Sequence, residues 1–231
     1  MQRRRHTNVE ETRAAILNAA EELFGQRGVH AVSLREINAV CSISQGVLHY
    51  HFGGREALVA AILDRHLPAV NETRRRMVDA LLAKQQVLQP RDAVSVLVEP
   101  LAQLAIDGGD AGMRFVRFLG RLHQDNDEVF LDMIYSYQRD VGMNQLLPRV
   151  FGQRDPALVD AQLAMMVDLM FSTLKTLDCP SRAWQKTLRK TPADPWQRVD
   201  WLVSFISQGL AEPNESLPIH VPDDTSTSAA Y

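Results

Sequence analysis

The alternation of apolar and polar residues in the segment SLREINAV predicts a short helix. Ser33 is followed three residues later by Glu36, a capping box in which each side chain satisfies a backbone donor at the helix start. Leu34, Ile37 and Val40 recur at helical spacing, so we expect them to form one buried side. The pattern therefore predicts a helix that begins directly after Ser33.

A second short helix is predicted after a tight turn, from Gln45 to about Tyr50, with Ser44 as its N-cap. The apolar residues expected on its buried side and next to it are Ile43, Val47, Leu48 and Phe52. The residues of both short helices expected to face outward are Arg35, Gln45, Gly46, His49 and Tyr50.

Longer helices are predicted on both sides of this pair. Isolated helices of fewer than roughly 12 residues are marginal in water, so the two short helices need support. One predicted helix precedes them, from Val9 to Gln26, with Asn8 as its cap and Gly28 as its end. Another begins at Arg55. The two short helices are therefore predicted to form a helix-turn-helix between two supporting helices, the geometry in which the second short helix enters a DNA major groove.

The run TRAAILNAAEELFGQRGVHAVSLREINAVCSISQGVLHYHFGGREAL, residues 12–58, resembles the DNA-binding domain of the TetR family of transcriptional regulators. The matching positions are Thr12, Ala19, Ala20, Phe24, Gly28, Ser33, Ile37, Ser44, Gly46, Leu48, His51, Phe52 and Leu58. The chain departs from the family's usual residues in having Asn38, Cys41, Ser42, His49 and Arg55. At Ser42 the family has Gly, at a turn position that favours positive φ.

The resemblance implies a homodimer that binds a palindromic double-stranded DNA operator, with half-sites roughly 34 Å apart. We expect Gln45 and Val47 to meet base edges, because Gln suits adenine and Val suits the thymine methyl group. The residues expected to hold phosphates are Ser33, Arg35, Ser44, His49, Tyr50 and Arg55. The alternative for Tyr50 is that it packs within the domain.

The remaining chain contains helix signals and no strand signal of any length, which predicts an all-α fold of about nine or ten helices. We expect a break or kink at Pro68, followed by helical segments over residues 70–88, 93–106, 110–122, 127–147, 157–177 and 196–211, with a short helix around Trp184 between the last two. Asp155 and Asp194, each before a proline, are expected to cap the last two long helices. The predicted domains are a DNA-binding domain over residues 1–56, an effector-binding and dimerisation domain over 57–212, and a disordered tail over 213–231.

The segment 157–177 is apolar nearly all round, so one side of it needs cover from outside its own core. In the TetR family the last two long helices of each subunit form a four-helix dimer contact, and the pattern agrees with that arrangement. The residues expected at this interface are Leu158, Met165, Leu169, Trp201 and Phe205.

The family resemblance also implies a small-molecule effector bound among the central helices, which shifts the population away from the DNA-competent arrangement. The candidate pocket residues are Phe115, Phe118, Met133, Tyr137, Met166 and Met170. Their thioethers and aromatic rings favour a largely apolar effector, although each is also an ordinary core residue. Two arginine groups have alternative interpretations. Arg74 to Arg76 either form a solvated helix face or approach DNA, while Arg114, Arg117 and Arg121 either face solvent or bind an acidic effector.

Composition adds the compartment and the charge. The 231 residues are 45% hydrophobic and 23% charged, with no secretory signal and no apolar run near the ~20 residues that span a bilayer, so we expect a cytoplasmic protein that makes no membrane contact. The net charge is -3, but residues 1–60 hold seven Arg and six Glu, a net charge of +1. Phosphate affinity must therefore come from the placement of groups such as Arg3 to Arg5.

Other chemistry finds little support in the sequence. Cys41 and Cys179 lack a CxxC partner and fit small hydrophobes in a reducing compartment. The segment HQDNDEVF fits the ligand spacing of neither a zinc site nor an EF-hand, so we expect no metal and no cofactor. A helical enzyme would carry a nucleophile elbow, a phosphate loop or a paired His and Glu motif. The sequence shows none of these motifs, so we expect that the protein is not an enzyme. A third class, a helical adaptor that binds protein, would lack salt-dependent DNA affinity.

Overall fold

The structure is a computed structural model that describes residues 2–84, 86–126, 139–152, 154–178 and 194–211, together with 132 and 136. Within this part the fold is all-helical, as the sequence predicts. Its elements are α1 (Gln2–Arg27), α2 (Leu34–Cys41), α3 (Gln45–Phe52), α4 (Arg55–Leu82), α5 (Pro90–Asp107), α6 (Gly109–Gln124), α8 (Met143–Phe151), α9 (Pro156–Leu174) and α11 (Pro195–Ala211).

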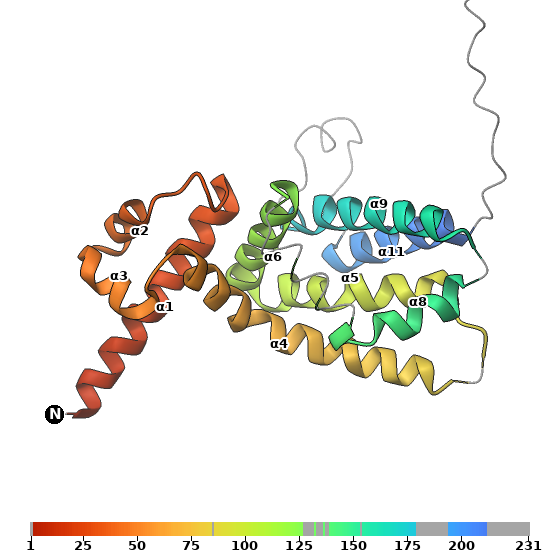
Figure 1. Ribbon diagram of the computed structural model, residues 1–231, viewed down its shortest axis with the longest axis horizontal. Helices are drawn as coiled ribbons and strands as arrows, with labels where there is room; N and C mark the ends of the chain where they lie inside the picture. The colour runs from red at the N-terminus through yellow and green to blue at the C-terminus, as the bar shows by residue number, and fades with distance from the viewer. Residues whose placement is uncertain are drawn as a thin grey trace, which may run out of the picture.

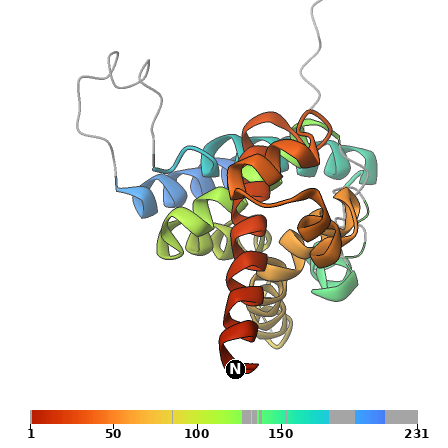
Figure 2. The ribbon, with the colours of Figure 1, turned by 90° about the vertical axis from the view of Figure 1, so that its left-hand side faces the viewer.

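The helices form two parts. Figure 1 shows α1, α2 and α3 at one end of the molecule, and these helices make up the N-terminal unit. Helices α5, α8, α9 and α11 lie toward the other end, and together with α4 and α6 they make up the body. The long α4 starts beside α3 and continues along the body, while α6 stands where the two parts meet (Figure 1). Viewed from the end, α1 runs through the N-terminal unit in front of the body (Figure 2). Helix α1 packs chiefly on α6.

The start of α2 is built as its sequence predicts. Ser33 Oγ accepts a hydrogen bond from the Glu36 amide at 3.2 Å, and Glu36 Oε2 accepts one from the Ser33 amide at 2.8 Å. Ile37 is fully buried, but the prediction that Val40 is buried is wrong, because Val40 is 63% exposed. The buried positions of α2 are Ile37 and its neighbour Asn38, so the inward side is rotated toward Asn38 and away from Val40.

The turn between α2 and α3 confirms the positive φ expected at Ser42. Ser42 has a φ of 54° and a ψ of 39°, in the left-handed region. For a residue with a Cβ this conformation costs about 1–2 kcal/mol relative to a right-handed one. The Ser42 amide donates to the Ala39 carbonyl and the Ile43 amide to the Asn38 carbonyl, at 3.2 and 3.0 Å, so both amides that follow α2 are bonded to its last turn.

Helix α1 begins earlier than its apolar pattern predicts. It starts at Gln2, so Asn8 lies inside the helix and the predicted cap at Asn8 is wrong. Residues 2–8 contain neither Gly nor Pro and include three arginines, which are good helix formers, so nothing local stops the helix there. Its end is as predicted, because Gly28 adopts a φ of +91°.

The sequence predicts a kink or a break at Pro68. Helix α4 is one continuous helix with Pro68 inside it, so the chain does not break there. Leu63 and Val70 are buried on either side of Pro68, and this packing holds the helix despite the missing amide donor. The helix ends at Leu82 instead of reaching residue 88. Pro90 then occupies the first turn of α5, where its lack of an N–H costs nothing.

The later helices follow the predicted caps more closely than the predicted ends. Asp155 accepts a hydrogen bond from the Ala157 amide at 3.0 Å and Asp194 one from the Trp196 amide at 2.8 Å, which confirms both caps. The helix expected over residues 127–147 lies mostly outside the described residues, but Gly142 has a φ of +79° and α8 starts after it. The short helix expected around Trp184 and the tail from residue 213 lie outside the described residues.

Candidate nucleic-acid interface and ligand cavity

Helix α3 presents its polar side chains to solvent. Gln45, His49 and Tyr50 are exposed, Tyr50 by 81%, while Leu48 and Phe52 are buried against the supporting helices. The alternative in which Tyr50 packs within the domain is therefore wrong. Of the two residues predicted to meet bases, Gln45 is exposed and Val47 is half-buried. Arg35 of α2 is exposed as well.

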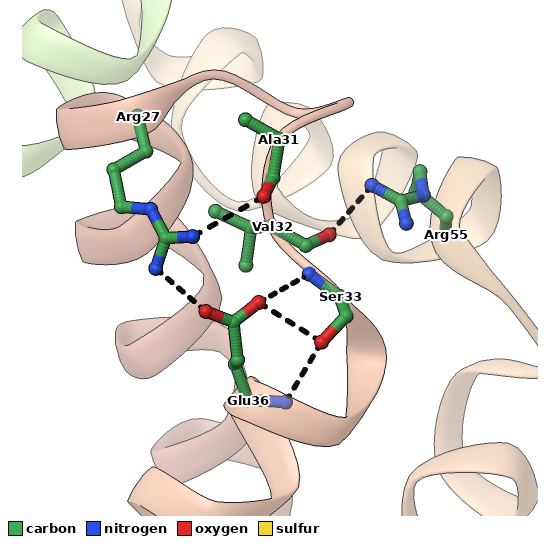
Figure 3. Close-up of polar contacts among 6 residues, drawn as sticks. All are labelled: Arg27, Ala31, Val32, Ser33, Glu36 and Arg55. Carbon is green, nitrogen blue, oxygen red and sulfur yellow. Dashed lines mark hydrogen bonds and ion pairs between the residues drawn. The ribbon is translucent and has the colours of Figure 1, made fainter.

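A polar clamp fixes the start of α2 relative to α1 and α4 (Figure 3). Arg27, at the end of α1, binds Glu36 with 2.7 Å between Nη1 and Oε1, and also donates to the Ala31 carbonyl at 3.3 Å. Hydrogen bonds from the Ser33 amide, Arg27 and the Ser33 hydroxyl lower the pKa of Glu36 to about 2 from an ordinary 4.5. Glu36 is thus ionised at neutral pH while it caps α2.

Two of the residues predicted to hold phosphates have different surroundings from those expected. Arg55 donates from Nη1 to the Val32 carbonyl at 2.7 Å and to the Val29 carbonyl, so its guanidinium supports the loop between α1 and α2. Ser44 occupies the N-cap position of α3 in extended conformation, but its side chain makes no capping bond and the residue is exposed. Ser44 therefore stands at the predicted N-cap position, but its side chain does not cap the helix.

The body contains a largely apolar cavity of about 110 Å³. Residues of α4, α5, α6, α8 and α9 line it: Leu67, Asn71, Arg74, Leu97, Leu101, Leu119, Met143, Leu147, Leu163, Met166, Val167, Met170 and Phe171. Met166 and Met170, both candidate effector residues, lie in this wall. Met133 and Tyr137, two further candidates, lie outside the described residues.

Phe115 and Phe118, the other two candidates, do not line the cavity. Both are fully buried on the side of α6 that meets α1 and α4. Phe118 lies 6.3 Å from the Phe24 ring of α1, and Phe115 stacks on the His66 ring of α4 at 4.3 Å. Sequence periodicity identifies both as inward-facing but cannot say which neighbour they meet.

A buried polar contact completes this joint between the N-terminal unit and the body. Glu21 of α1 is fully buried, and its Oε2 lies 3.2 Å from His66 Nε2 and 3.8 Å from Arg65 Nη1. Arg65 also donates to the side-chain oxygen of Asn18 at 2.6 Å. Sequence analysis missed this group, although a Glu between the apolar positions of α1 is an available signal.

The sequence pattern also predicts the wrong surroundings for Arg74. It is 6% exposed, so neither the solvated face nor the DNA contact expected for Arg74 to Arg76 applies to it, while Arg75 and Arg76 are exposed. Val70, Arg74 and Val78 are spaced four apart and all buried, which places Arg74 on the inward side of α4. In the second arginine group, Arg117 binds Asp178 and Arg121 binds Asp125, at 2.5 and 2.9 Å.

Large apolar side chains are exposed along α9 and α11. Met165, Trp196, Trp201 and Phe205 are 67%, 40%, 55% and 70% exposed, whereas Leu158 and Leu169 are half-buried. The two helices run side by side along one edge of the body (Figure 1). Within the described residues α9 is the one helix long and apolar enough to cross a bilayer. Core helices of soluble proteins have the same length and composition, so this property alone does not indicate a membrane-spanning helix.

These features define a class of protein: a helix-turn-helix unit joined to a helical body that contains an apolar cavity. Two family profiles match the chain. Residues 16–62 match the profile described as bacterial regulatory proteins, tetR family, and residues 95–209 match that of a tetracyclin repressor-like C-terminal domain. The two profiles describe the two parts of one architecture and together span most of the chain, and the chain belongs to the TetR family.

Individual relatives resemble about a quarter of the chain in sequence. The regulator UidR of Escherichia coli K12 is 46% identical over 57 residues, which are 25% of this chain and 29% of UidR. The repressor Rv3405c of Mycobacterium tuberculosis H37Rv is 45% identical over 62 residues, 27% of this chain and 33% of that protein. The chain thus matches about a third or less of the length of either relative.

The fold also resembles solved structures. The crystal structure of RHA5900, described as a probable transcriptional regulatory protein, aligns over 87% of this chain and 100% of its own with a TM-score of 0.53 and 19% identity. At that identity the likeness concerns the fold alone. Membership of a family of DNA-binding regulators supports the expectation that the chain is not an enzyme.

Proposed function

We propose that the protein is a ligand-responsive transcriptional regulator that binds a palindromic DNA operator as a homodimer. The observation that carries this proposal is α3, whose exposed polar side lies opposite the buried Leu48 and Phe52. A helix packed on one side and exposed on the other suits insertion in a major groove. Gln45 would read a base edge, and Arg35, His49 and Tyr50 would bind the DNA backbone. Such a protein works in the cytoplasm, where the chromosome lies.

Homodimerisation is supported by the exposed apolar side chains of α9 and α11. Of the eight large apolar side chains exposed in the described part of the chain, four lie on these two helices. A second copy of the chain would bury them in a symmetric contact. Two copies would then present two α3 helices to the two half-sites of one operator.

The cavity is the proposed effector site, with Met166 and Met170 in its wall and a largely apolar ligand inside. Its wall includes Leu67 of α4 and Leu119 of α6. The residues next to these, His66 and Phe118, contact α1. A ligand that moves α4 or α6 would therefore move the N-terminal unit, and release from DNA would follow as a population shift. We propose repression, the activity named for the relative Rv3405c.

Fluorescence anisotropy with DNA flanking the protein's own gene tests this function. We expect binding whose affinity falls steeply with salt. Gln45→Ala should weaken specific binding by about 1–3 kcal/mol, and Arg35→Ala should reduce the salt slope by about 1. Lys84→Ala is the matched control, because it removes an exposed positive charge at the far end of α4.

The same titration separates a regulator from a helical adaptor that binds protein. An adaptor would show no salt-dependent DNA affinity. Unchanged binding by folded Gln45→Ala and Tyr50→Ala dimers would reject α3 as the contact surface.

A further inference from the structure

The cavity has one polar side. Eleven of its thirteen described lining residues are apolar, and the two polar ones, Asn71 and Arg74, lie three residues apart on α4. Among the described lining residues, a polar group of a bound molecule therefore finds its partners at this turn of α4. The rest of the described wall, which includes Met166 and Met170, offers contacts to an apolar body.

Arg74 is hydrogen-bonded to two neighbours at the cavity wall. Its Nη2 donates to the Leu97 carbonyl of α5 at 2.9 Å and its Nη1 to the Asn71 side-chain oxygen at 3.3 Å. The residue is 6% exposed, and a guanidinium does not lose its proton in a protein. Burying such a charge costs several kcal/mol, a cost that Leu or Met at this inward position would avoid. A cation is thus fixed at the edge of an apolar space.

The chemistry of a guanidinium limits what can bind next to it. It only donates hydrogen bonds, so a ligand group at this place must accept them. A cationic ligand would be repelled, and a carboxylate would form short, charge-assisted hydrogen bonds that a neutral amide cannot match. A phosphate dianion would need more positive charge than the one arginine that lines the described wall provides.

We propose that the effector is an amphipathic monoanion: an apolar body that carries a single carboxylate, with the carboxylate at Arg74 and the body against Met166 and Met170. This inference rests on the proposed function of the cavity as the effector site. The cavity volume of about 110 Å³ is smaller than the apolar cavity of about 150 Å³ that holds benzene, so a body of a few carbon atoms fills it as it stands. A longer acyl chain must widen the cavity, which would displace α4 or α6.

Thermal stability of the full chain, measured with octanoate, octanamide and octylamine, tests the charge preference. These probes share one apolar chain and differ in the charge of the head group. Octanoate should raise the melting temperature, because a ligand that binds only the folded state stabilises it. By calorimetry it should bind at least tenfold more tightly than octanamide, and octylamine should not bind.

The variant Arg74→Met tests the residue. It should weaken octanoate binding at least tenfold and leave octanamide binding unchanged or tighter. Arg76→Met, whose guanidinium lies on the exposed side of the same helix, should behave as the wild type. If Arg74→Met does not fold, Arg74→Lys replaces it: the charge is kept and the planar fork is lost, so octanoate should bind more weakly but still in preference to octanamide.

Several results would overturn the proposal: equal binding of octanoate and octanamide by the wild type, no stabilisation by octanoate, or an unchanged preference in folded Arg74→Met. These measurements contain no DNA, so they do not depend on operator binding. If octanamide binds as well as octanoate and also releases the operator, the proposed function stands and the anionic effector does not. If octanoate binds through Arg74 but no operator is bound, the reverse holds.

Discussion

Glu36 connects three parts of the N-terminal unit through one carboxylate. It caps α2, binds Arg27 of α1 and accepts hydrogen bonds from Ser33. Each of these contacts favours the ionised form, which is why the pKa of Glu36 falls to about 2. The folded state therefore holds this group charged more strongly than the unfolded chain does.

Glu36→Gln tests this linkage to pH. Because the folded pKa of about 2 lies below the ordinary 4.5, the contribution of Glu36 to stability is complete above pH 4.5 and is lost as the pH falls through about 2. Gln retains the shape of a capping box but no charge. Thermal unfolding should show a lower melting temperature for the variant at pH 7 and a shrinking difference between pH 4.5 and 2.5.

A control for this variant is Glu10→Gln, which changes an exposed carboxylate of α1. It should leave the melting temperature nearly unchanged across the same range. A difference for Glu36→Gln that stays constant down to pH 2.5 would contradict the assigned role.

Residues with short-range partners are the ones that sequence predicts well. Ser33 with Glu36 and Asp155 with its following proline act within three residues, so their spacing alone identifies them. Arg55 and Arg74 are different, because their partners Val32 and Leu97 each lie 23 residues away in the chain. Only the packing of α4 against its neighbours decides that one supports a loop and the other lines a cavity.

At the scale of elements, the joint of α1 with α4 and α6 determines how the N-terminal unit sits on the body. A Cβ on Gly25 would lie 3.2 Å from the Phe118 backbone nitrogen, so α1 and α6 approach closely there. Beside this contact, buried Glu21 pairs with His66, whose ring stacks on Phe115. Helix periodicity predicts that these side chains face inward, but the pairing of helices is a long-range property that it does not contain.

Glu21→Ala should destabilise the protein by about 3 kcal/mol, because it leaves His66 and Arg65 without their buried carboxylate. Denaturant unfolding measures this change, and Glu10→Ala should alter stability by less than about 0.5 kcal/mol. A double-mutant cycle with His66→Ala should give a coupling energy above about 0.5 kcal/mol. Additive effects of the two substitutions would show that the pair does not hold the joint.

At the scale of the whole molecule, the exposed side of α9 and α11 is the proposed surface of dimerisation. Phe205→Glu places a charge on the proposed contact, where Phe205 is 70% exposed in the single chain. We expect light scattering after gel filtration to give the mass of one chain, 26.0 kDa, for this variant and twice that for the wild type. Operator affinity should fall with dimerisation, because one α3 reads only one half-site.

Val87→Glu is the matched control, since it also replaces an exposed apolar side chain with Glu, at an 81% exposed position in the loop between α4 and α5. It should remain dimeric. A dimeric Phe205→Glu protein would place the contact elsewhere on the molecule. Sequence pattern identifies Trp201 and Phe205 as lying off the core side, but cannot supply the partner surface that would cover them.

Because the cavity is small, the affinity of a ligand and its effect on DNA binding need not follow one another. At the proposed effector site, a molecule that fits the roughly 110 Å³ space as it stands does not require the helices to move apart, and a ligand that does not favour the widened arrangement cannot shift the population toward it however strongly it binds. Only a molecule too large for that space favours the widened arrangement. Within a homologous series, short members would then act as competitive antagonists and longer ones as inducers, with the change of sign set by chain length.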